Sequence, residues 1–249
     1  MFPLDDDNPT LAAPLVTYAL VALNVAAWFG LQGAGRDPWL ASSVCDLGLI
    51  PGELLGLVPD GLRVPLGPDA SCELHPAAAN WASPFTSMFL HGGWMHLIGN
   101  MWFLWVFGNN VEDSMGRARF VAFYLLCGLA AAAAQVFVHP SSPVPMVGAS
   151  GAIGGVMGAY AVLYPHARVQ MLLVLGFFVT RAVVPAYVVL GYWFLLQILG
   201  SLPAVEGEGG GVAFWAHLGG FVAGLLLSFV FRDPVLVEAH RHATGGRLS

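Results

Sequence analysis

Long apolar runs alternate with polar segments along most of the chain. The runs carry almost no charge, and most have the length of a helix that crosses a membrane. They predict helices at residues 15–31, 94–107, 120–138, 150–164, 183–199 and 214–231. A further apolar run, residues 169–178, is too short to span and precedes Arg181, so we expect a loop or interfacial segment there. The pattern predicts an all-α fold, a polytopic bundle of six transmembrane helices.

The segments outside these runs divide the chain further. Residues 1–14 are polar and acidic, and residues 232–249 form a short polar tail, so both are expected to be solvated ends of a membrane domain at residues 15–231. Residues 32–90 are too long for a simple connection and too apolar for a flexible tether. Part of this first loop is therefore expected to lie in the membrane interface as short helices.

The amino-acid composition also predicts a membrane protein. The chain of 249 residues is 57% hydrophobic and only 10% charged, with a mean hydropathy of +0.71. An ordinary soluble domain is less apolar than this, so the lipid bilayer is the expected surrounding. The net charge of -6 and the lack of a basic patch argue against nucleic acid as a partner.

Arginine placement predicts the orientation of the bundle. An even number of spans puts both termini on one side, and the chain has arginine but no lysine. Arg36 and Arg63 fall on the side opposite the termini, whereas most arginines fall on the side of the termini: Arg117, Arg119, Arg168, Arg181, Arg232, Arg241 and Arg247. Positive charge concentrates on the cytoplasmic side of membrane proteins. Both termini are therefore expected in the cytoplasm, and the helix end at Ser150 is expected to face outside.

The run VGASGA at residues 147–152 marks the start of the fourth helix, directly after a proline-rich loop. Residues 150–164 rise only about 21 Å, against a hydrocarbon thickness of about 30 Å. Ser150 is therefore expected beneath the membrane surface, at a helix N-terminus. Such a terminus offers unpaired backbone N–H groups and a positive dipole end to a developing oxyanion. This placement makes Ser150 a candidate nucleophile.

Three more polar side chains fall at a similar depth. Counted from the cytoplasmic edge at about 1.5 Å per residue, His217 lies about 22 Å deep, His96 about 24 Å and Asn100 about 18 Å. Ionisable groups inside a membrane are costly and usually face the protein interior, so a shared depth suggests a shared site. Each residue also has a structural interpretation: packing for Ser150, an interhelical hydrogen bond for His96 and Asn100, and a structural or proton-relay role for His217.

Small residues favour close contact between the fourth and sixth predicted helices. They are Gly151, Gly154, Gly155, Gly158, Gly220 and Gly224. No acidic residue lies within a predicted span at the depth of His217, so a serine hydrolase built here would use a dyad. His217 would take the proton from Ser150 and return it to the leaving amine. The Ser150 N–H, His96 and Asn100 would hold the oxyanion.

These motifs resemble the rhomboid family of intramembrane serine proteases over residues 15–231. The matching patterns are Gly148-Ala149-Ser150-Gly151, His91-x4-His96-x3-Asn100 and Ala216-His217-x2-Gly220-x3-Gly224. The resemblance implies a six-helix core, a Ser150–His217 dyad, an oxyanion hole helped by His96 and Asn100, and a structural or supporting role for His91. Substrates would be single-pass membrane proteins cut within or beside their transmembrane helix. They would enter past the fifth span, with residues 206–211 as a mobile cap. The compact chain and the lack of a targeting segment separately lead us to expect a prokaryotic plasma membrane.

The chain departs from the family pattern at two places. Many rhomboids carry Trp-Arg in the first loop, where this chain has Trp81-Ala82, which leaves the anchoring of that loop open. Some members place an aromatic residue four positions after the serine to stack on the histidine. Gly154 stands there in this chain, which leaves open what orients His217.

Other classes of protein fit the sequence less well. A metalloprotease would need a motif such as His-Glu-x-x-His, which the chain lacks. A non-catalytic rhomboid-like scaffold that binds membrane proteins is the main alternative to the protease. The acidic residues Glu206 and Glu208 lie near the expected mouth of the site, but we assign them no catalytic role. No cofactor or metal is implied.

The chain has three cysteines with different expected roles. Cys127 falls in the third predicted helix, where a cysteine packs as a small apolar residue. Cys45 and Cys72 share the first loop on the predicted outer side, which is an oxidising environment. The sequence leaves open whether this pair forms a disulfide or two free thiols.

Overall fold

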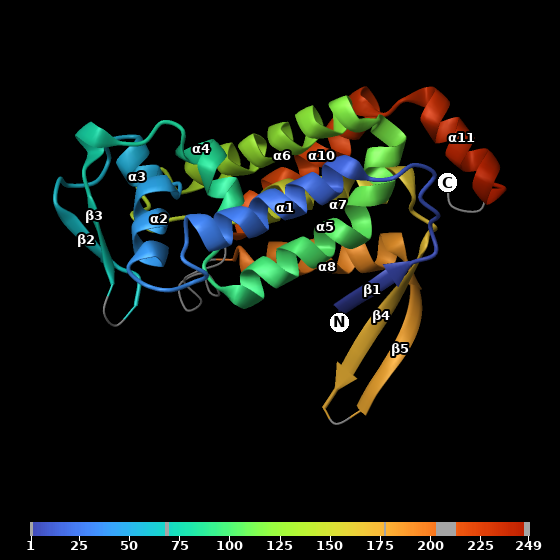
Figure 1. Cartoon of the computed structure of the whole chain (residues 1–249), viewed down its shortest axis with the longest axis horizontal. Helices are drawn as coiled ribbons and strands as arrows, with labels where there is room; N and C mark the ends of the chain where they lie inside the picture. The colour runs from blue at the N-terminus through green and yellow to red at the C-terminus, as the bar shows by residue number, and fades with distance from the viewer. Residues whose placement is uncertain (1, 68–69, 177, 203–212, 247–249) are drawn as a thin grey trace.

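A bundle of long helices dominates the computed structural model of the chain (Figure 1). The structure describes residues 2–67, 70–176, 178–202 and 213–246. Each predicted apolar run forms one helix of the bundle: α1 (Leu15–Gly30), α5 (Trp94–Met115), α6 (Arg117–Val138), α7 (Ser150–Leu163), α8 (Ala186–Gly200) and α10 (Phe214–Phe231). The prediction of a mostly helical fold is confirmed, although α5 continues well beyond its predicted end at residue 107.

The helices of the bundle differ in length and polarity. Of the described helices, α6 and α10 are long and apolar enough to cross a membrane. Helices α1, α7 and α8 are apolar but shorter, with 16, 14 and 15 residues. Helix α5 has 22 residues, but its last two turns carry amide and carboxylate side chains. Large apolar side chains are exposed on the outside of the bundle, including Leu23, Phe29, Leu195 and Leu226. Such a surface is typical of contact with lipid.

Helix α7 is almost wholly buried at the centre of the bundle, where it contacts α5, α6, α8 and α10. Its glycines let the α10 backbone approach closely. A Cβ at Gly220 would lie 2.0 Å from the carbonyl oxygen of Gly151, and a Cβ at Gly224 would lie 1.9 Å from that of Gly155. Any larger side chain would push the two helices apart. The close contact predicted from the small-residue pattern is therefore present, and it fixes the register of α7 against α10.

Strands correct the prediction of an all-α fold. Strand β4 (Arg168–Leu175) and strand β5 (Phe178–Pro185) form an antiparallel hairpin, and β1 (Phe2–Asp6) pairs with β4. Residues 169–178, expected to be a loop or interfacial segment, are therefore mostly strand. In β4, Val169 and Met171 are buried while Gln170 between them is exposed, which is the alternation of a half-buried strand. The hairpin projects sideways from the bundle (Figure 1).

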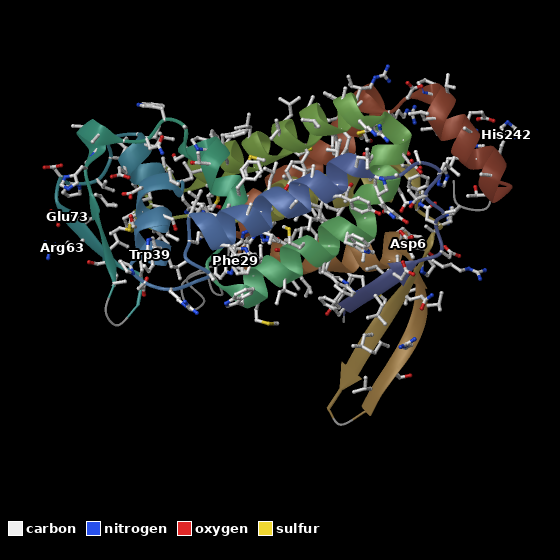
Figure 2. All side chains as sticks on the ribbon, in the orientation of Figure 1. Asp6, Phe29, Trp39, Arg63, Glu73 and His242 are labelled. Atoms are coloured by element: carbon white, nitrogen blue, oxygen red, sulfur yellow. A yellow bond between two sulfur atoms is a disulfide. The ribbon has the colours of Figure 1, made fainter. Side chains whose placement is uncertain are left out.

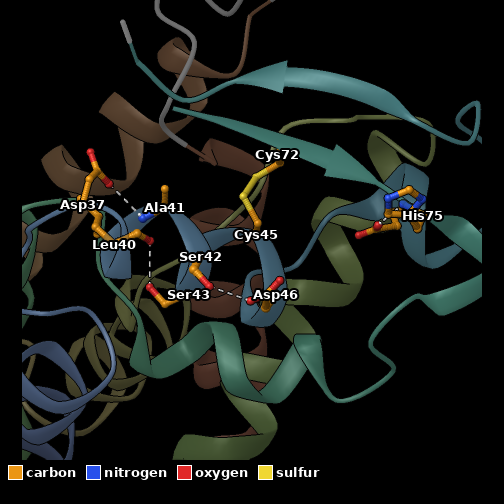
Figure 3. The surroundings of a disulfide bond; sticks show 10 residues. Asp37, Leu40, Ala41, Ser42, Ser43, Cys45, Asp46, Cys72 and His75 are labelled. Carbon is orange, nitrogen blue, oxygen red and sulfur yellow. Dashed lines mark hydrogen bonds between the residues drawn. A yellow bond between two sulfur atoms is a disulfide. The ribbon is translucent and has the colours of Figure 1, made fainter. Parts of the chain in front are cut away.

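The first loop, residues 32–90, folds as a small subdomain at one end of the bundle. Its elements are α2 (Trp39–Leu47), α3 (Pro51–Leu54), β2 (Leu62–Pro65), β3 (Ser71–Leu74), α4 (Ser83–Thr86) and two 3-10 turns, Pro76–Ala78 and Ser87–Phe89. The short helices were predicted, whereas the hairpin β2–β3 was not. A disulfide between Cys45 on α2 and Cys72 on β3 joins the two parts (Figure 3). The disulfide, one of the two alternatives left open by the sequence, is therefore present.

The chain termini lie at the opposite end of the bundle. Figure 2 shows Arg63 and Glu73 at the end formed by the first loop, and Asp6 and His242 at the other end. We call these the Ser150 end and the Tyr164 end, after the residues at the two ends of α7. The tail after residue 231 is mostly exposed, as expected of a solvated end, but it is not irregular. Helix α11 (Pro234–Thr244) forms there, with Asp233 as its N-cap.

Hydrogen bonds tie the N-terminal segment to the Tyr164 end. The Tyr160 hydroxyl donates to the Asp6 carboxylate and accepts from Asn8 Nδ2 at 3.2 Å. Asn110 Nδ2 donates to the Asn8 carbonyl at 3.0 Å. The buried His240 of α11 lies 3.0 Å from the Pro9 carbonyl oxygen. Burial raises the pKa of Asp6 to about 7, and the hydrogen bonds from Tyr160 and the Asn8 N–H oppose that shift.

A buried carboxylate closes the same end of the bundle. Glu112 on α5 accepts from the N–H groups of Val16 and Thr17 at 3.0 and 2.8 Å, and from the Thr17 hydroxyl at 2.9 Å. These N–H groups belong to the first turn of α1, which has no side-chain cap of its own. The positive end of the α1 dipole also favours a carboxylate there. A side chain of one helix therefore caps another helix at the Tyr164 end.

Candidate active site

Ser150 is the first residue of α7, directly after a backbone turn at Gly148. Gly148 has a φ of 131°, in the region that favours glycine, and its N–H donates to the Ser87 carbonyl at 2.9 Å. A Cβ at Gly148 would lie 2.7 Å from His96 Nε2. Both the backbone conformation and the space beside His96 therefore require a glycine. This explains why the loop before Ser150 carries one.

Ser150 and His217 are joined by a hydrogen bond. The distance between Ser150 Oγ and His217 Nε2 is 2.7 Å. His217 lies on the first turn of α10, and the glycine contacts between α7 and α10 bring the two helices close enough for this bond. This distance is within the range expected of a nucleophile and its general base. The two groups that the sequence paired by depth are therefore in direct contact.

Asn100 and His96 on α5 supply donors to the same site. Asn100 Nδ2 is buried and has no hydrogen-bond partner among the residues that the structure describes. His96 Nδ1 accepts from the Gly92 N–H at 3.3 Å. Because a neutral imidazole has one donor and one acceptor, Nε2 of His96 then carries the proton. Nε2 is the atom that lies beside Gly148. An unpaired amide and an imidazole N–H are thus available near Ser150.

These residues line one cavity of about 1090 Å³ that also contains the Ser150–His217 pair. Its wall on the bundle side includes Asn100 and Ile153, and its outer wall includes residues of the first loop. The outer residues are mostly apolar or small: Leu40, Ala41, Val44, Leu66, Gly67 and Ala70. The subdomain that the disulfide closes therefore forms part of the boundary of the site.

His91 supports the site from behind. Its side chain is fully buried, and its ring lies 5.2 Å from the His96 ring in an edge-to-face contact. The side chain of Gln32 bonds its backbone twice, donating to the His91 carbonyl at 2.7 Å and accepting from the His91 N–H at 2.8 Å. Neither ring nitrogen of His91 has a partner in the described part of the chain. The structure therefore places His91 against His96, and its supporting role stays a prediction.

Four glycines near the dyad were expected to support it: Gly148, Gly151, Gly220 and Gly224. The close contact of Gly151 with Gly220 brings the first turns of α7 and α10 together, next to Ser150 and His217. Gly224 makes the corresponding contact one turn further along α10. Gly148 supports His96 instead, because its missing side chain leaves room for the imidazole. The four positions therefore act through backbone packing.

Two residues of α8 at the site were not predicted. Gln197 Oε1 lies 2.8 Å from His217 Nδ1, and the ring of Trp193 lies 5.9 Å from the His217 ring. Trp193 also comes within 3.6 Å of where a Cβ of Gly154 would stand. Gln197 is the single amide side chain in the apolar run 183–199. The depth argument used for His96 and Asn100 would have singled it out.

The structure shows how the first loop is anchored in a chain that has Trp81-Ala82 in place of Trp-Arg. Trp81 is 74% exposed, and the loop is anchored by its neighbours instead. Asn80 Nδ2 donates to the Asp46 carbonyl at 2.9 Å, and the Thr86 hydroxyl donates to the Leu47 carbonyl at 2.7 Å. Both bonds attach the loop to α2. The expected cap at residues 206–211, with Glu206 and Glu208, lies outside the described residues.

Comparisons with known proteins all match the same family. The model of the Rhomboid domain family matches residues 78–234. Rhomboid protein 1, mitochondrial, of Saccharomyces cerevisiae is 28% identical over 62% of this chain and 43% of its own length. Rhomboid protease GluP of Bacillus subtilis is 34% identical over 57% of this chain and 27% of its own. RHOMBOID-like protein 5 of Arabidopsis thaliana is 31% identical over 57% of this chain and 41% of its own. The chain thus spans less than half the length of these relatives.

Proposed function

Because the chain belongs to the rhomboid family, whose members are membrane proteins, we propose that it is an intramembrane serine endopeptidase. The observation that carries the proposal is the 2.7 Å hydrogen bond between Ser150 Oγ and His217 Nε2, inside a cavity that also holds two donor side chains. The name of the related Rhomboid protease GluP supports the same activity. A nucleophile, a base and preorganised donors are the parts that acyl transfer requires.

In the proposed reaction, His217 Nε2 accepts the hydroxyl proton as Ser150 Oγ attacks the scissile carbonyl carbon. The carbonyl oxygen becomes an oxyanion, which accepts hydrogen bonds from the Ser150 N–H, Asn100 Nδ2 and His96 Nε2. His217 then gives its proton to the leaving amine, and an acyl enzyme remains. A water molecule, deprotonated by His217, cleaves the ester and releases the second product. Each step uses a group that already faces the cavity.

The proposed setting is a cell membrane with the Ser150 end on the extracytoplasmic side. The six helices of the bundle would span the bilayer as one domain, residues 15–231, with both termini in the cytoplasm. The exposed apolar side chains around the bundle and the arginines of the Tyr164 end support this orientation. Helix α7 has 14 residues and rises only about 21 Å, so the hydroxyl would lie beneath the membrane surface.

Single-pass membrane proteins are the proposed substrates, cut within or beside their transmembrane helix. The cavity is continuous from Ser150 to the apolar residues of the first loop, so it offers room for an extended peptide rather than an intact helix. In lipid, the backbone N–H and C=O groups of a helix form hydrogen bonds with each other within the helix. Substrates with small or helix-breaking residues near the cut site would therefore be favoured.

The test is cleavage of a tagged single-pass substrate by the purified protein in liposomes. Wild type, Ser150→Ala and His217→Ala are compared, each with and without a metal chelator. We expect cleavage by wild type alone, unaffected by chelator. A panel of substrates that stays intact with wild type, yet crosslinks equally to wild type and Ser150→Ala, would instead favour the non-catalytic scaffold. Inhibition by chelator would favour a metalloprotease.

A further inference from the structure

His217, the base of the proposed reaction, has a second hydrogen-bond partner on a different helix. His217 Nδ1 lies 2.8 Å from Gln197 Oε1, while its Nε2 lies 2.7 Å from Ser150 Oγ. Ser150, His217 and Gln197 therefore form a continuous chain of hydrogen bonds across α7, α10 and α8. The Gln197 side chain is 8% exposed, so water does not compete freely for its oxygen.

The orientation of the Gln197 amide determines which nitrogen of His217 carries the proton. Gln197 Nε2 donates to the Trp193 carbonyl at 3.3 Å, one turn earlier on the same helix. This bond leaves Oε1, an acceptor, pointing at His217 Nδ1. Nδ1 must then be the protonated nitrogen, and Nε2 presents its lone pair to the Ser150 hydroxyl. The opposite tautomer would give Nε2 a proton and prevent it from acting as a base.

The ring of His217 is also restrained by an aromatic side chain from α8. Trp193 lies 5.9 Å from His217 with a tilt of 39° between the rings, and it stacks on Phe221 at 5.9 Å. Its ring edge occupies the space beside Gly154, next to the His217 carbonyl. A side chain at Gly154 would have to compete with Trp193 for that space. One helix thus supplies both the hydrogen bond and the ring contact.

We propose that Gln197 is a positioning residue that holds the His217 imidazole in the tautomer and orientation required of the base, with Trp193 restraining the ring. The inference rests on the proposed protease function and deepens it from a dyad to a hydrogen-bonded Ser150–His217–Gln197 triad in which Gln197 transfers no proton. An amide is suited to this position because its oxygen accepts a hydrogen bond from the Nδ1–H without placing a charge within the bundle.

The experiment compares Gln197→Met, Gln197→Glu and Gln197→Ala with wild type. Methionine has a similar length but cannot accept the hydrogen bond, whereas glutamate keeps an acceptor oxygen. The rate of Ser150 labelling by a fluorophosphonate measures nucleophile activation without a protein substrate. Initial rates of substrate cleavage separate kcat from KM. Ser201→Ala is the matched control, because the Ser201 hydroxyl at the C-cap of α8 donates to the Ile198 carbonyl.

We expect Gln197→Met and Gln197→Ala to lower the labelling rate and kcat by about 10- to 100-fold, with KM changed less than about twofold. Gln197→Glu should recover most of the rate, and Ser201→Ala should match wild type. If Gln197→Met fails to fold, the ratio between Gln197→Ala and Gln197→Glu provides the same test. Labelling and kcat at the wild-type level in Gln197→Met, or equal losses in the glutamate and alanine variants, would overturn the inference. A wild type that neither labels nor cleaves would overturn the proposed function itself.

Discussion

The two ends of α7 differ in how their polar side chains are bonded. At the Tyr164 end, Tyr160 is bonded to Asp6 and Asn8, and the hydroxyl of Tyr164 is bonded to Ser114. At the Ser150 end, the amide nitrogen of Asn100 and both ring nitrogens of His91 are buried without a partner among the described residues. A large cavity lies at the Ser150 end. Asn8 Oδ1 and Asn110 Oδ1 of the Tyr164 end are also buried without a partner among these residues. The difference between the ends therefore lies in the unpaired donor nitrogen of Asn100 and in the cavity, both at the Ser150 end.

This difference separates stability from chemistry along a single helix. A buried polar group without a partner costs about 1–3 kcal/mol, and folded proteins contain few of them. A donor left unpaired in the free protein can bond an oxyanion during reaction without first breaking another bond. The cost at the Ser150 end is offset by the packing and hydrogen bonds elsewhere, including those of the Tyr164 end. Substitutions at the two ends should therefore change different quantities.

The largest expected effect comes from the dyad itself. Ser150→Ala and His217→Ala should each lower kcat by about 10⁴-fold or more, because neither the attack nor the proton transfer has a substitute. The melting temperature should stay within a few degrees of wild type, since Ser150 contributes little packing. Single-turnover cleavage in liposomes measures the first effect, and a thermal melt measures the second. A double variant much slower than either single variant would contradict a shared role.

The next largest effect is expected from removal of the Cys45–Cys72 disulfide, which lies at the Ser150 end. Cys45 and Cys72 are 27 residues apart in sequence, and closing a loop of that size stabilises the folded state by about 3–4 kcal/mol. Cys45→Ser with Cys72→Ser should speed hydrogen exchange and proteolysis in residues 39–74. The Tyr164 end should be unaffected. Cys127→Ser, which removes a buried thiol without breaking a disulfide, is the control. Equal hydrogen exchange in wild type and the double cysteine variant would show that the apolar core of the first loop is stable without the disulfide.

Two amides on α5 offer a direct comparison of the ends. Asn100→Ala should lower kcat about 100-fold, as expected when one oxyanion donor is removed, with little change in stability. Asn110→Ala should instead lower the free energy of unfolding by about 1–3 kcal/mol, because it leaves the Asn8 carbonyl without its donor. Kinetics and thermal melts on both variants give the two readouts. The comparison fails if Asn110→Ala reduces kcat as much as Asn100→Ala.

The smallest effect concerns pH at the Tyr164 end. Burial raises the pKa of Asp6 to about 7, above its unfolded value of 3.8. A raised pKa in the folded state means that the stabilising contribution is full below pH 3.8 and is lost as the pH rises through 7. Wild type should therefore be less stable than Asp6→Asn at pH 8, by about 1 kcal/mol after solvent screening, with the gap closing toward pH 5. Melting temperatures of both proteins between pH 5 and 8 measure it. A gap independent of pH would contradict the shift.

Sequence patterns predicted those parts of the structure that depend on local or periodic signals. The apolar runs located the helices, the glycine spacing located the contact of α7 with α10, and depth arguments brought Ser150 and His217 together. The hairpin β4–β5 was missed because its run was judged only by length. Its alternation at Val169, Gln170 and Met171 and the Gly176 turn are signals of strands. The helix after residue 231 was missed because its stability depends on Asp233 and on contacts with the N-terminal segment.

The depth of Gln197 in its apolar run could have marked it as a candidate, but its partner could not be predicted, for a different reason. Its contact with His217 joins two helices across a loop, and no periodicity marks the register of one helix against another. The sequence showed that the aromatic residue expected after Ser150 was missing at Gly154. It did not show that Trp193, far along the chain, fills the same space. Substitutions that are compensated from another helix are visible only once the packing is known.

The glycine contacts between α7 and α10 also affect how the results of saturation mutagenesis on this chain should be interpreted. Gly151, Gly155, Gly220 and Gly224 have no room for a Cβ, so nearly every replacement would abolish function as completely as loss of Ser150. Tolerance profiles alone would therefore rank scaffold positions beside the reacting groups. Scoring surface abundance alongside activity would separate the two classes, since the glycine variants would disappear from the membrane while Ser150→Ala would accumulate there intact.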